Sequence, residues 1–231
     1  MIENLIIERD RFEINSEEWL KRNRQKADYL ESIKPSTKER IIAFKESDLK
    51  EIPEGFTSTN QLPNIPYFIE RRSILEYNPI QRHPIPYCLV RYQDQFFFIL
   101  RESGSGELRL IGKKGLLGGH IGEEDVNSES LVETIFNGLK RELAEEAGIT
   151  SEMIVKTEIK GLIKSNDGVD SDHLGIVYEV ELNTNQIQSE EEGVLKGIWI
   201  DKNDLLQHVD SFESWARIVY NEVLQKTLIV S

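Results

Sequence analysis

Three glutamates, Glu142, Glu145 and Glu146, stand within five positions of one another in the segment RELAEEAG, residues 141–148. At this spacing they share one face of a helix, where like charges repel one another and a bound cation would relieve the repulsion. Carboxylate oxygens are the ligands that Mg²⁺ takes, and the ion keeps several positions for water and substrate phosphates. A charge run on a helix is usually a solvated face, so the surrounding sequence must decide between a solvated face and a metal site.

The segment lies near the end of the most strongly periodic part of the chain. Apolar residues recur there at helical spacing: Val132, Ile135, Phe136, Leu139, Leu143 and Ala147. Ser130 and Glu133 form a capping box just before this stripe, and Gly148 suits the left-handed position that ends a helix. The pattern predicts a helix over residues 131–147, with the three carboxylates at the edge of the buried stripe.

Composition limits the functions that the chain can have. The 231 residues suit one large domain, or a domain with an extension, and 39% hydrophobic and 30% charged residues are typical of a soluble globular protein. A net charge of −13 argues against nucleic-acid binding and implies that divalent cations would stand between this protein and an anionic ligand. The single cysteine, Cys88, excludes an intramolecular disulfide and a cysteine-based zinc site. Without a membrane-length apolar stretch or a signal peptide, the expected location is cytoplasmic, with no membrane partner.

The order of expected elements indicates an α/β protein with a mixed sheet flanked by helices. Residues 1–38 are charge-rich and predict a helical extension that packs on the main domain, residues 39–231, or on a second subunit in a homodimer. Strands are expected at residues 40–44, 87–92, 96–100, 107–110, 154–165, 173–182 and 193–200, with a turn at residues 166–168 and a last helix over residues 213–225. Runs of strands on both sides of one central helix favour a layered α/β fold.

The nine residues from Arg141 to Ile149 fit every position of the core of the Nudix box, Arg-Glu-U-X-Glu-Glu-X-Gly-U, where U is a bulky aliphatic residue. Glu133 stands the required eight residues before Arg141. The sequence therefore resembles the Nudix hydrolases. The box should begin with glycine at position 127, which is Asn here, and the nearest glycines are Gly118 and Gly119. We interpret the difference as an eight-residue insertion within HIGEEDVNSESL, residues 120–131, between the glycine loop and the helix.

The resemblance covers roughly residues 40–231. Landmarks similar to those of a bacterial MutT-like, or phosphoesterase-like, Nudix subgroup are IPY, ELRL, GGHI, HLGIVYEVEL and ESW. The resemblance implies an α/β/α sandwich and Mg²⁺-dependent or Mn²⁺-dependent hydrolysis of a diphosphate bond in a nucleoside diphosphate linked to another group. By the same resemblance, metal ligands would be Glu142, Glu145, Glu146 and the carbonyl oxygen of Gly119. Glu133 and Arg141 would brace the loop against the helix. Glu145 or Glu146 would act as the catalytic base.

Four further residues are candidates for the base or for substrate contacts. Glu191 and Glu192 belong to the acidic run SEEEG, and some Nudix hydrolases take their base from a downstream loop of this kind. His120 follows the glycine pair and could face a phosphate, and His173 begins an expected strand. Each of the four also fits an ordinary solvated or hydrogen-bonded role.

Two alternatives to a hydrolase follow from the same resemblance. Some Nudix modules bind a ligand without turnover, but the carboxylates expected to be catalytic are intact here. The isopentenyl diphosphate isomerases share the fold and use a catalytic cysteine. Cys88 lies in the apolar strand PYCLV, where a free cysteine is commonly a small buried hydrophobic residue. A diphosphohydrolase is the favoured function, with a small nucleotide or other diphosphate as substrate.

Overall fold

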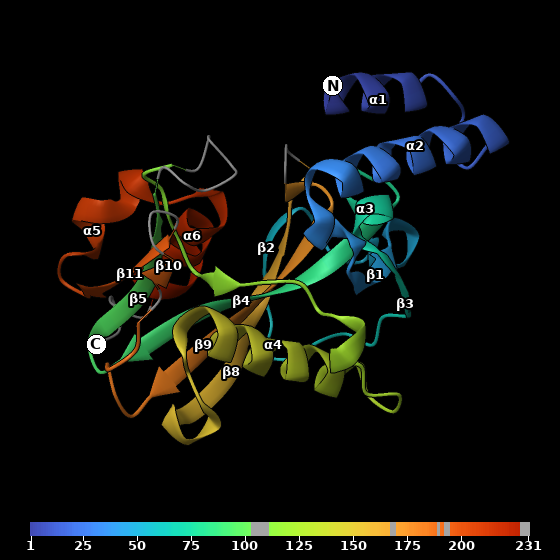
Figure 1. Cartoon of the computed structure of the whole chain (residues 1–231). Helices are drawn as coiled ribbons and strands as arrows, with labels where there is room; N and C mark the ends of the chain where they lie inside the picture. Colours follow the sequence, from blue (N-terminus) through green and yellow to red (C-terminus); the bar gives the residue numbers. More distant parts are fainter. Residues whose placement is uncertain (103–110, 167–169, 189, 192–194, 227–231) are drawn as a thin grey trace.

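Figure 1 shows a central sheet with helices on both sides and two N-terminal helices at one end. The structure, a computed structural model, describes residues 1–102, 111–166, 170–188, 190–191 and 195–226, with only the main chain of residues 190 and 191. Within these ranges no helix has the length and apolar character needed to cross a bilayer. The strand expected at residues 107–110 and most of the turn at 166–168 lie outside the described residues.

The main sheet is mixed, as predicted. Its strand order is β10 (Glu190–Glu191), β11 (Leu195–Asp201), β5 (Gln95–Arg101), β4 (Gln81–Tyr92), β9 (His173–Leu182), β8 (Ile154–Lys164) and β2 (Gly55–Ser58). The central strands β4 and β9 run parallel, with His83, the third residue of β4, opposite His173, the first residue of β9. The other pairs along this order are antiparallel. The parallel pair therefore brings together residues 90 positions apart at one end of the sheet.

Two differences from the expected strands concern β4. It begins at Gln81 rather than near residue 87. The β4–β5 turn contains Gln93 and Asp94 between paired Tyr92 and Gln95, so the loop has two residues rather than three. Gln93 has a positive φ of 52°, which fits the twist of a tight two-residue hairpin.

Alternation along β4 divides the core into two layers. Cys88 and Val90 pack in the core on the side of α4 (Leu131–Ala147), while Tyr87 and Leu89 pack in the core on the side of α6 (Ser214–Val219). A π-helical turn, Tyr220–Leu224, continues α6. Successive side chains on a strand point to opposite faces, so a strand buried on both faces must be apolar throughout. The predicted α/β/α sandwich is confirmed.

The glycine-rich segment forms two short strands, β6 (Lys114–Gly115) and β7 (Leu117–Gly118). Gly115 pairs with Ile99 of β5 and Gly118 with Tyr87 of β4, so the segment lies between these two strands. A Cβ atom on Gly118 would lie 2.6 Å from the carbonyl oxygen of Pro86, which leaves room only for glycine. The glycine-rich segment is therefore part of the sheet, and its strand β7 contacts α4.

The N-terminal extension packs on the main domain. It comprises α1 (Ile2–Arg9) and α2 (Glu17–Ile33), and α2 lies against α3 (Arg72–Leu75). The buried Arg9 guanidinium donates to the carbonyl oxygen of Tyr77 at 2.8 Å, and Lys26 Nζ donates to that of Ile74 at 3.2 Å. The domain boundary at residue 38 and the homodimer remain predictions.

The remaining elements are short or peripheral. They are η1 (Pro35–Lys38), β1 (Arg40–Lys45), η2 (Glu46–Leu49), β3 (Tyr67–Arg71), η4 (Glu123–Asp125), η5 (Ser151–Met153), α5 (Leu205–His208) and η7 (Val209–Ser211). Strand β1 pairs with β3 along its length and with the start of β4 at Phe44 and Lys45. Strands β1 and β3 therefore extend the sheet beside the start of β4.

Candidate metal-binding active site

Helix α4 carries the three glutamates and is fixed at both ends by local sequence. The Ser130 hydroxyl accepts a hydrogen bond from the Glu133 amide at 3.2 Å, and Gly148 has the left-handed φ of 62°. The apolar stripe at Ile135, Leu139 and Leu143 is buried in the core. The helix and both caps match the sequence prediction, so the face that carries the carboxylates is set by local signals.

Two of the carboxylates lie against the glycine pair at the end of β7. The Gly118 amide donates to Glu146 Oε2 at 3.1 Å. A Cβ atom on Gly119 would lie 2.2 Å from Cδ of Glu142, so this carboxylate occupies the space that any other side chain at 119 would fill. Glu145 lies at the rim, with 61% of its side chain exposed. The Gly119 main chain is therefore close to Glu142, as a shared ligand set requires.

The environment of these carboxylates favours a cation. Burial raises the pKa of Glu146 to about 7; the negative charge of Glu142 adds to the rise, while the Gly118 amide opposes it. Burial also raises the pKa of Glu142, although the Arg141 guanidinium opposes this rise. Two carboxyl groups withdrawn from water are costly to ionise side by side, and a divalent cation bound by oxygen ligands offsets that cost. The donor set of Glu142, Glu146, Glu145 and the Gly119 carbonyl fits Mg²⁺ or Mn²⁺.

Arg141 ties this cluster to the loop that precedes the helix. Its Nη2 donates to Asp125 Oδ2 and to the His120 carbonyl oxygen, both at 2.8 Å. Its Nη1 donates to Glu142 Oε1 at 2.8 Å and to Glu145 Oε2 at 3.0 Å. These partners, Asp125 first, raise the pKa of Arg141 above its ordinary value. One guanidinium therefore holds two of the candidate ligands and the loop in a fixed relation.

Comparison with known proteins supports the fold described above. No model of a protein family matches the chain. Protein YmaB of Bacillus subtilis (strain 168) is 30% identical over 154 residues, which are 64% of this chain and 74% of YmaB. The crystal structure of Tm1382, described as a candidate Nudix hydrolase, superposes with a TM-score of 0.67 at 25% identity, covering 81% of this chain and all of Tm1382. The chain belongs to the Nudix hydrolase family.

A second structure shows the same fold at greater distance. DR0079 of Deinococcus radiodurans is 15% identical and has a TM-score of 0.50 over 80% of this chain and 99% of its own. Membership of the Nudix family supports a pyrophosphohydrolase-type function in general.

The Nudix box of this chain departs from the expected pairing of Glu133 with Arg141. The structure gives Arg141 a different carboxylate, Asp125, which is 5% exposed. Glu133 is exposed near the start of α4, about 12 Å before Arg141 along the helix axis. The predicted pairing of Glu133 with Arg141 is therefore corrected. Asp125 of η4 contacts the Arg141 guanidinium, and Glu133 lies two helical turns away.

The segment interpreted as an insertion is part of the packed fold. Ile121 is buried in the α4 core, and its carbonyl oxygen accepts from the Ile42 amide of β1 at 3.0 Å. Gly122 forms a bridge with Ile41, and its amide donates to Asp125 Oδ2 at 2.9 Å. Residues 120–125 thus join β1 to the Nudix helix and are not an appended loop.

Glu133 instead lines a groove on the other flank of α4. This groove has a volume of about 930 Å³ and is bounded by residues 58–60 and 154–160, with Glu133, Phe136 and Tyr178. Each helical residue advances about 100°, so Glu133 and Phe136 lie across the buried stripe from Glu142 and Glu146. Glu142 and Glu146 do not line this groove.

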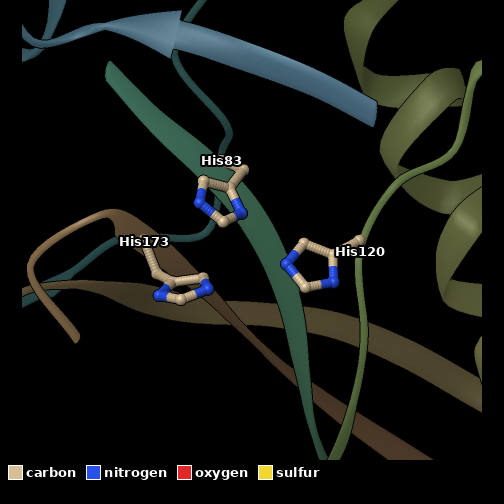
Figure 2. A group of neighbouring side chains, drawn as sticks. All are labelled: His83, His120 and His173. Atoms are coloured by element: carbon tan, nitrogen blue, oxygen red, sulfur yellow. The ribbon is translucent and has the colours of Figure 1, made fainter. Parts of the chain in front are cut away.

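The other residues selected from the sequence lie in different settings. His120 and His173 come together with His83, which the sequence analysis did not select (Figure 2). The main chain of Glu191 is in β10 and its side chain is not described, while Glu192 lies outside the described residues. Their proposed role as a base remains a prediction.

Two residues near the site bear on its chemistry. Cys88 is 1% exposed in β4, and burial, with the charges of Glu146 and Glu142, raises the pKa of its thiol well above the ordinary value. This environment does not favour a thiolate nucleophile. Glu213 was not selected as a site residue, yet its Oε1 accepts from the Tyr87 hydroxyl at 2.6 Å and its Oε2 lies 3.5 Å from Arg101 Nε.

Glu213 braces the glycine segment from the α6 side of the sheet. The Leu116 amide donates to the Tyr87 hydroxyl at 3.1 Å, and a Cβ atom on Gly115 would lie 2.4 Å from Glu213 Oε1. The positive charge of Arg101 partly opposes the rise in the pKa of Glu146. The segment that leads to Gly118 is therefore held by α4 carboxylates on one side and by Glu213 on the other. The only signal in the sequence was the ESW triplet at the start of the last helix.

Proposed function

We propose that the protein is a Mg²⁺-dependent hydrolase that cleaves a diphosphate bond in a nucleoside diphosphate linked to another group. The observation that carries the proposal is the contact of Glu142 and Glu146 with the Gly118–Gly119 main chain. This contact supports a site in which two partly buried carboxylates would bind an ion together with the Gly119 carbonyl. Oxygen ligands of this kind suit Mg²⁺, and Mn²⁺ by the same chemistry.

Different groups of the chain would bind the metal ion and hold its ligands in position. Glu142, Glu146 and the Gly119 carbonyl would hold the ion, with Glu145 reaching it from the exposed rim. Arg141 keeps Glu142 and Glu145 in place through its two Nη1 hydrogen bonds. When bound, Mg²⁺ supplies charge neutralisation at the diphosphate oxygens and activates water for attack on phosphorus.

Proton removal from the attacking water would fall to Glu145 or Glu146. A base works best when its pKa lies close to the operating pH. Burial brings the pKa of Glu146 to about 7 in the absence of metal, so this carboxyl can exchange a proton near neutral pH. Glu145 is more exposed and has water access, which makes it the other acceptor.

The test compares thermal melts of the wild type and Glu146→Gln, each with Mg²⁺ and with chelator at matched ionic strength. A ligand that binds only the folded chain at a hundredfold excess over its Kd adds about 2.7 kcal/mol, or roughly 5–10 °C in Tm for a chain of this size. We expect such a shift in the wild type and a much smaller one in Glu146→Gln. Glu152→Gln, at an exposed glutamate of η5, is the matched control and should keep the wild-type shift.

The substrate is sought with a panel of nucleoside diphosphates linked to sugars, nucleosides or other groups, by measuring released mononucleotide or phosphate. Glu145→Gln and Glu146→Gln should each lower turnover by orders of magnitude with the fold intact. Equal metal-induced shifts in the wild type and Glu146→Gln, together with retained turnover in both variants, would contradict the proposal.

A further inference from the structure

Three histidine side chains meet at the end of the sheet that carries the N-terminal extension. They are His83 of β4, His173 at the start of β9 and His120 of the loop after β7, and Figure 2 shows their rings around a common space. One ring nitrogen from each lies within 4.8 Å of the other two. The ring centroids are 4.2 Å apart for His83 and His173 and 4.9 Å for His83 and His120. Strand register produces this meeting, since His83 pairs directly with His173.

Hydrogen bonding leaves part of this cluster unexplained. His83 is fully buried, and within the described part of the chain neither of its ring nitrogens has a hydrogen-bond partner. The carboxylate oxygen Asp172 Oδ2 lies 3.8 Å from His83 Nε2, too far for a hydrogen bond. The buried Nε2 of His120 is also unpartnered among the described residues. Buried polar atoms in folded proteins almost always have a hydrogen-bond partner or bind an ion or water. A bound ligand would satisfy these ring nitrogens.

The third histidine is oriented by a buried carboxylate. His173 Nδ1 lies 2.9 Å from Asp172 Oδ1, and the Tyr77 amide donates to Asp172 Oδ2 at 2.7 Å. With Nδ1 directed to Asp172, a metal would be bound by the other ring nitrogen of His173, Nε2. A carboxylate that holds the distal nitrogen of an imidazole is the usual outer partner of a histidine that binds a metal.

The charges around the cluster permit a cation. Arg72 is the nearby guanidinium, and its charge is balanced by Glu39 and Glu76, each 2.7 Å from it. Lys26 is directed to the carbonyl oxygens of Ile74 and Glu76. Asp172, 5% exposed, then supplies negative charge directly beside the imidazoles.

The geometry points to a second metal site in this protein, in which His83, His120 and His173 bind a divalent transition metal of the zinc class, with Asp172 orienting His173. Zinc with nitrogens at about 2.0–2.1 Å holds them roughly 3.3–3.4 Å apart, a contraction that small ring rotations can supply. Imidazole nitrogen suits zinc, cobalt, nickel or copper, and hardly suits Mg²⁺. Three protein ligands leave the fourth tetrahedral position open to water or another small ligand.

This site is separate from the carboxylates of α4. His83 shares its face of β4 with Ile85 and Tyr87, which pack in the core on the α6 side, and the His173 ring contacts Trp215 of α6. His120 directly follows Gly119, whose carbonyl is a candidate ligand of the first site. Metal held by the histidines would therefore fix the glycine loop from the opposite side.

The test uses the full chain carrying Glu142→Gln, Glu145→Gln and Glu146→Gln, stripped of metal with chelator. This background removes the carboxylate site, so failure of the histidine site can be told from failure of the proposed hydrolase site. We expect one equivalent of Co²⁺ to bind with visible absorption bands from nitrogen coordination, to be displaced by Zn²⁺ and to persist in excess Mg²⁺. His120→Asn and His173→Asn should each weaken binding more than about 100-fold, and Asp172→Asn about 10- to 100-fold.

The matched control is His208→Asn, at the fourth histidine of the chain, in α5, which should leave Co²⁺ affinity unchanged. Because a histidine variant could lose binding by misfolding, NMR of the protein with all its histidines gives a second test. The imidazole resonances of three histidines should shift on addition of Zn²⁺, while those of His208 should not. Absence of Co²⁺ binding, binding that survives both histidine variants, or movement of these resonances with inorganic phosphate and not with Zn²⁺ would each overturn the inference.

Discussion

Arg141 Nη2 lies 2.8 Å from Oδ2 of Asp125, and this pair joins the loop of η4 to the helix that carries the candidate ligands. The same guanidinium donates to Glu142, so the position of this candidate ligand depends on Asp125, which lies sixteen places before Arg141 in the chain. Asp125 also accepts from the Gly122 amide, which fixes the carboxylate on its own loop.

Asp125→Asn should therefore lower both stability and turnover. Loss of one charge from a largely buried pair leaves the partner uncompensated, and we expect a loss of about 1–3 kcal/mol because Arg141 keeps other partners and some water. Turnover should fall about tenfold or more as Glu142 loses its support. Urea denaturation and steady-state kinetics on a substrate from the panel measure the two effects.

Glu133→Gln is the matched control for Asp125→Asn, because Glu133 is the residue that the Nudix box pairs with Arg141. It is exposed, so its replacement should change the free energy of unfolding by less than about 0.5 kcal/mol. A larger loss of stability in Glu133→Gln than in Asp125→Asn would show that Arg141 is held mainly by Glu133 and not by Asp125.

The two glycines before His120 should respond differently to alanine. At Gly119 the added Cβ meets the end of the Glu142 side chain, which can move. Gly119→Ala should keep Tm within a few degrees of the wild type and lower turnover and the Mg²⁺-induced shift. At Gly118 the Cβ meets the Pro86 carbonyl oxygen at 2.6 Å, so Gly118→Ala should also lower Tm markedly. Similar Tm losses in the two variants would argue against the contact with Glu142.

Cys88→Ala separates a hydrolase from an isomerase with a catalytic thiol. Cys88 is a small buried side chain in β4, so alanine should cost about 1 kcal/mol of stability and leave turnover within twofold of the wild type. The measurement is the steady-state turnover of Cys88→Ala and of the wild type, compared at the same concentration of folded protein. Abolished turnover in a folded Cys88→Ala protein would favour covalent chemistry at this thiol.

Local signals explain what could be predicted about the site. The apolar stripe of α4, its Ser130 cap and Gly148 lie within one segment, and so do Glu142, Glu145 and Glu146. Asp125 could not be selected in the same way, because its role comes from the fold of residues 120–125 against β1. His83 needed the parallel register of β4 and β9, which no spacing in the sequence reveals.

The same division holds for the fold. Long alternating or apolar runs predicted β8 and β9 to within about a residue. The short β2 strand was missed because Gly55 and the prolines around it favour a loop, and only pairing with β8 makes residues 55–58 a strand. The early start of β4 was missed for a similar reason, since Pro84 and Pro86 discourage a strand that its neighbours nevertheless complete.

Lys26 helps to hold the N-terminal extension against the main domain. It is fully buried on α2 and donates to the carbonyl oxygens of Ile74 and Glu76. Burial, together with the charge of Arg9, lowers the pKa of Lys26 from 10.5 to about 7, while Glu76 and Asp172 oppose the shift. Between pH 7 and 10.5 the unfolded chain therefore binds more protons at this residue than the folded chain.

Stability should consequently rise with pH in that window, because the slope of the free energy of unfolding follows the excess of protons in the unfolded state. From pH 7 to pH 9 the gain attributable to Lys26 should be roughly 2 kcal/mol. Lys26→Met should remove this gain, whatever its effect on stability at pH 7, where the two carbonyl oxygens lose their donor. Lys21→Met, at an exposed lysine of the same helix, should keep the wild-type slope. Urea denaturation at both pH values tests the prediction, and equal slopes for the wild type and Lys26→Met would show that Lys26 stays charged in the folded chain.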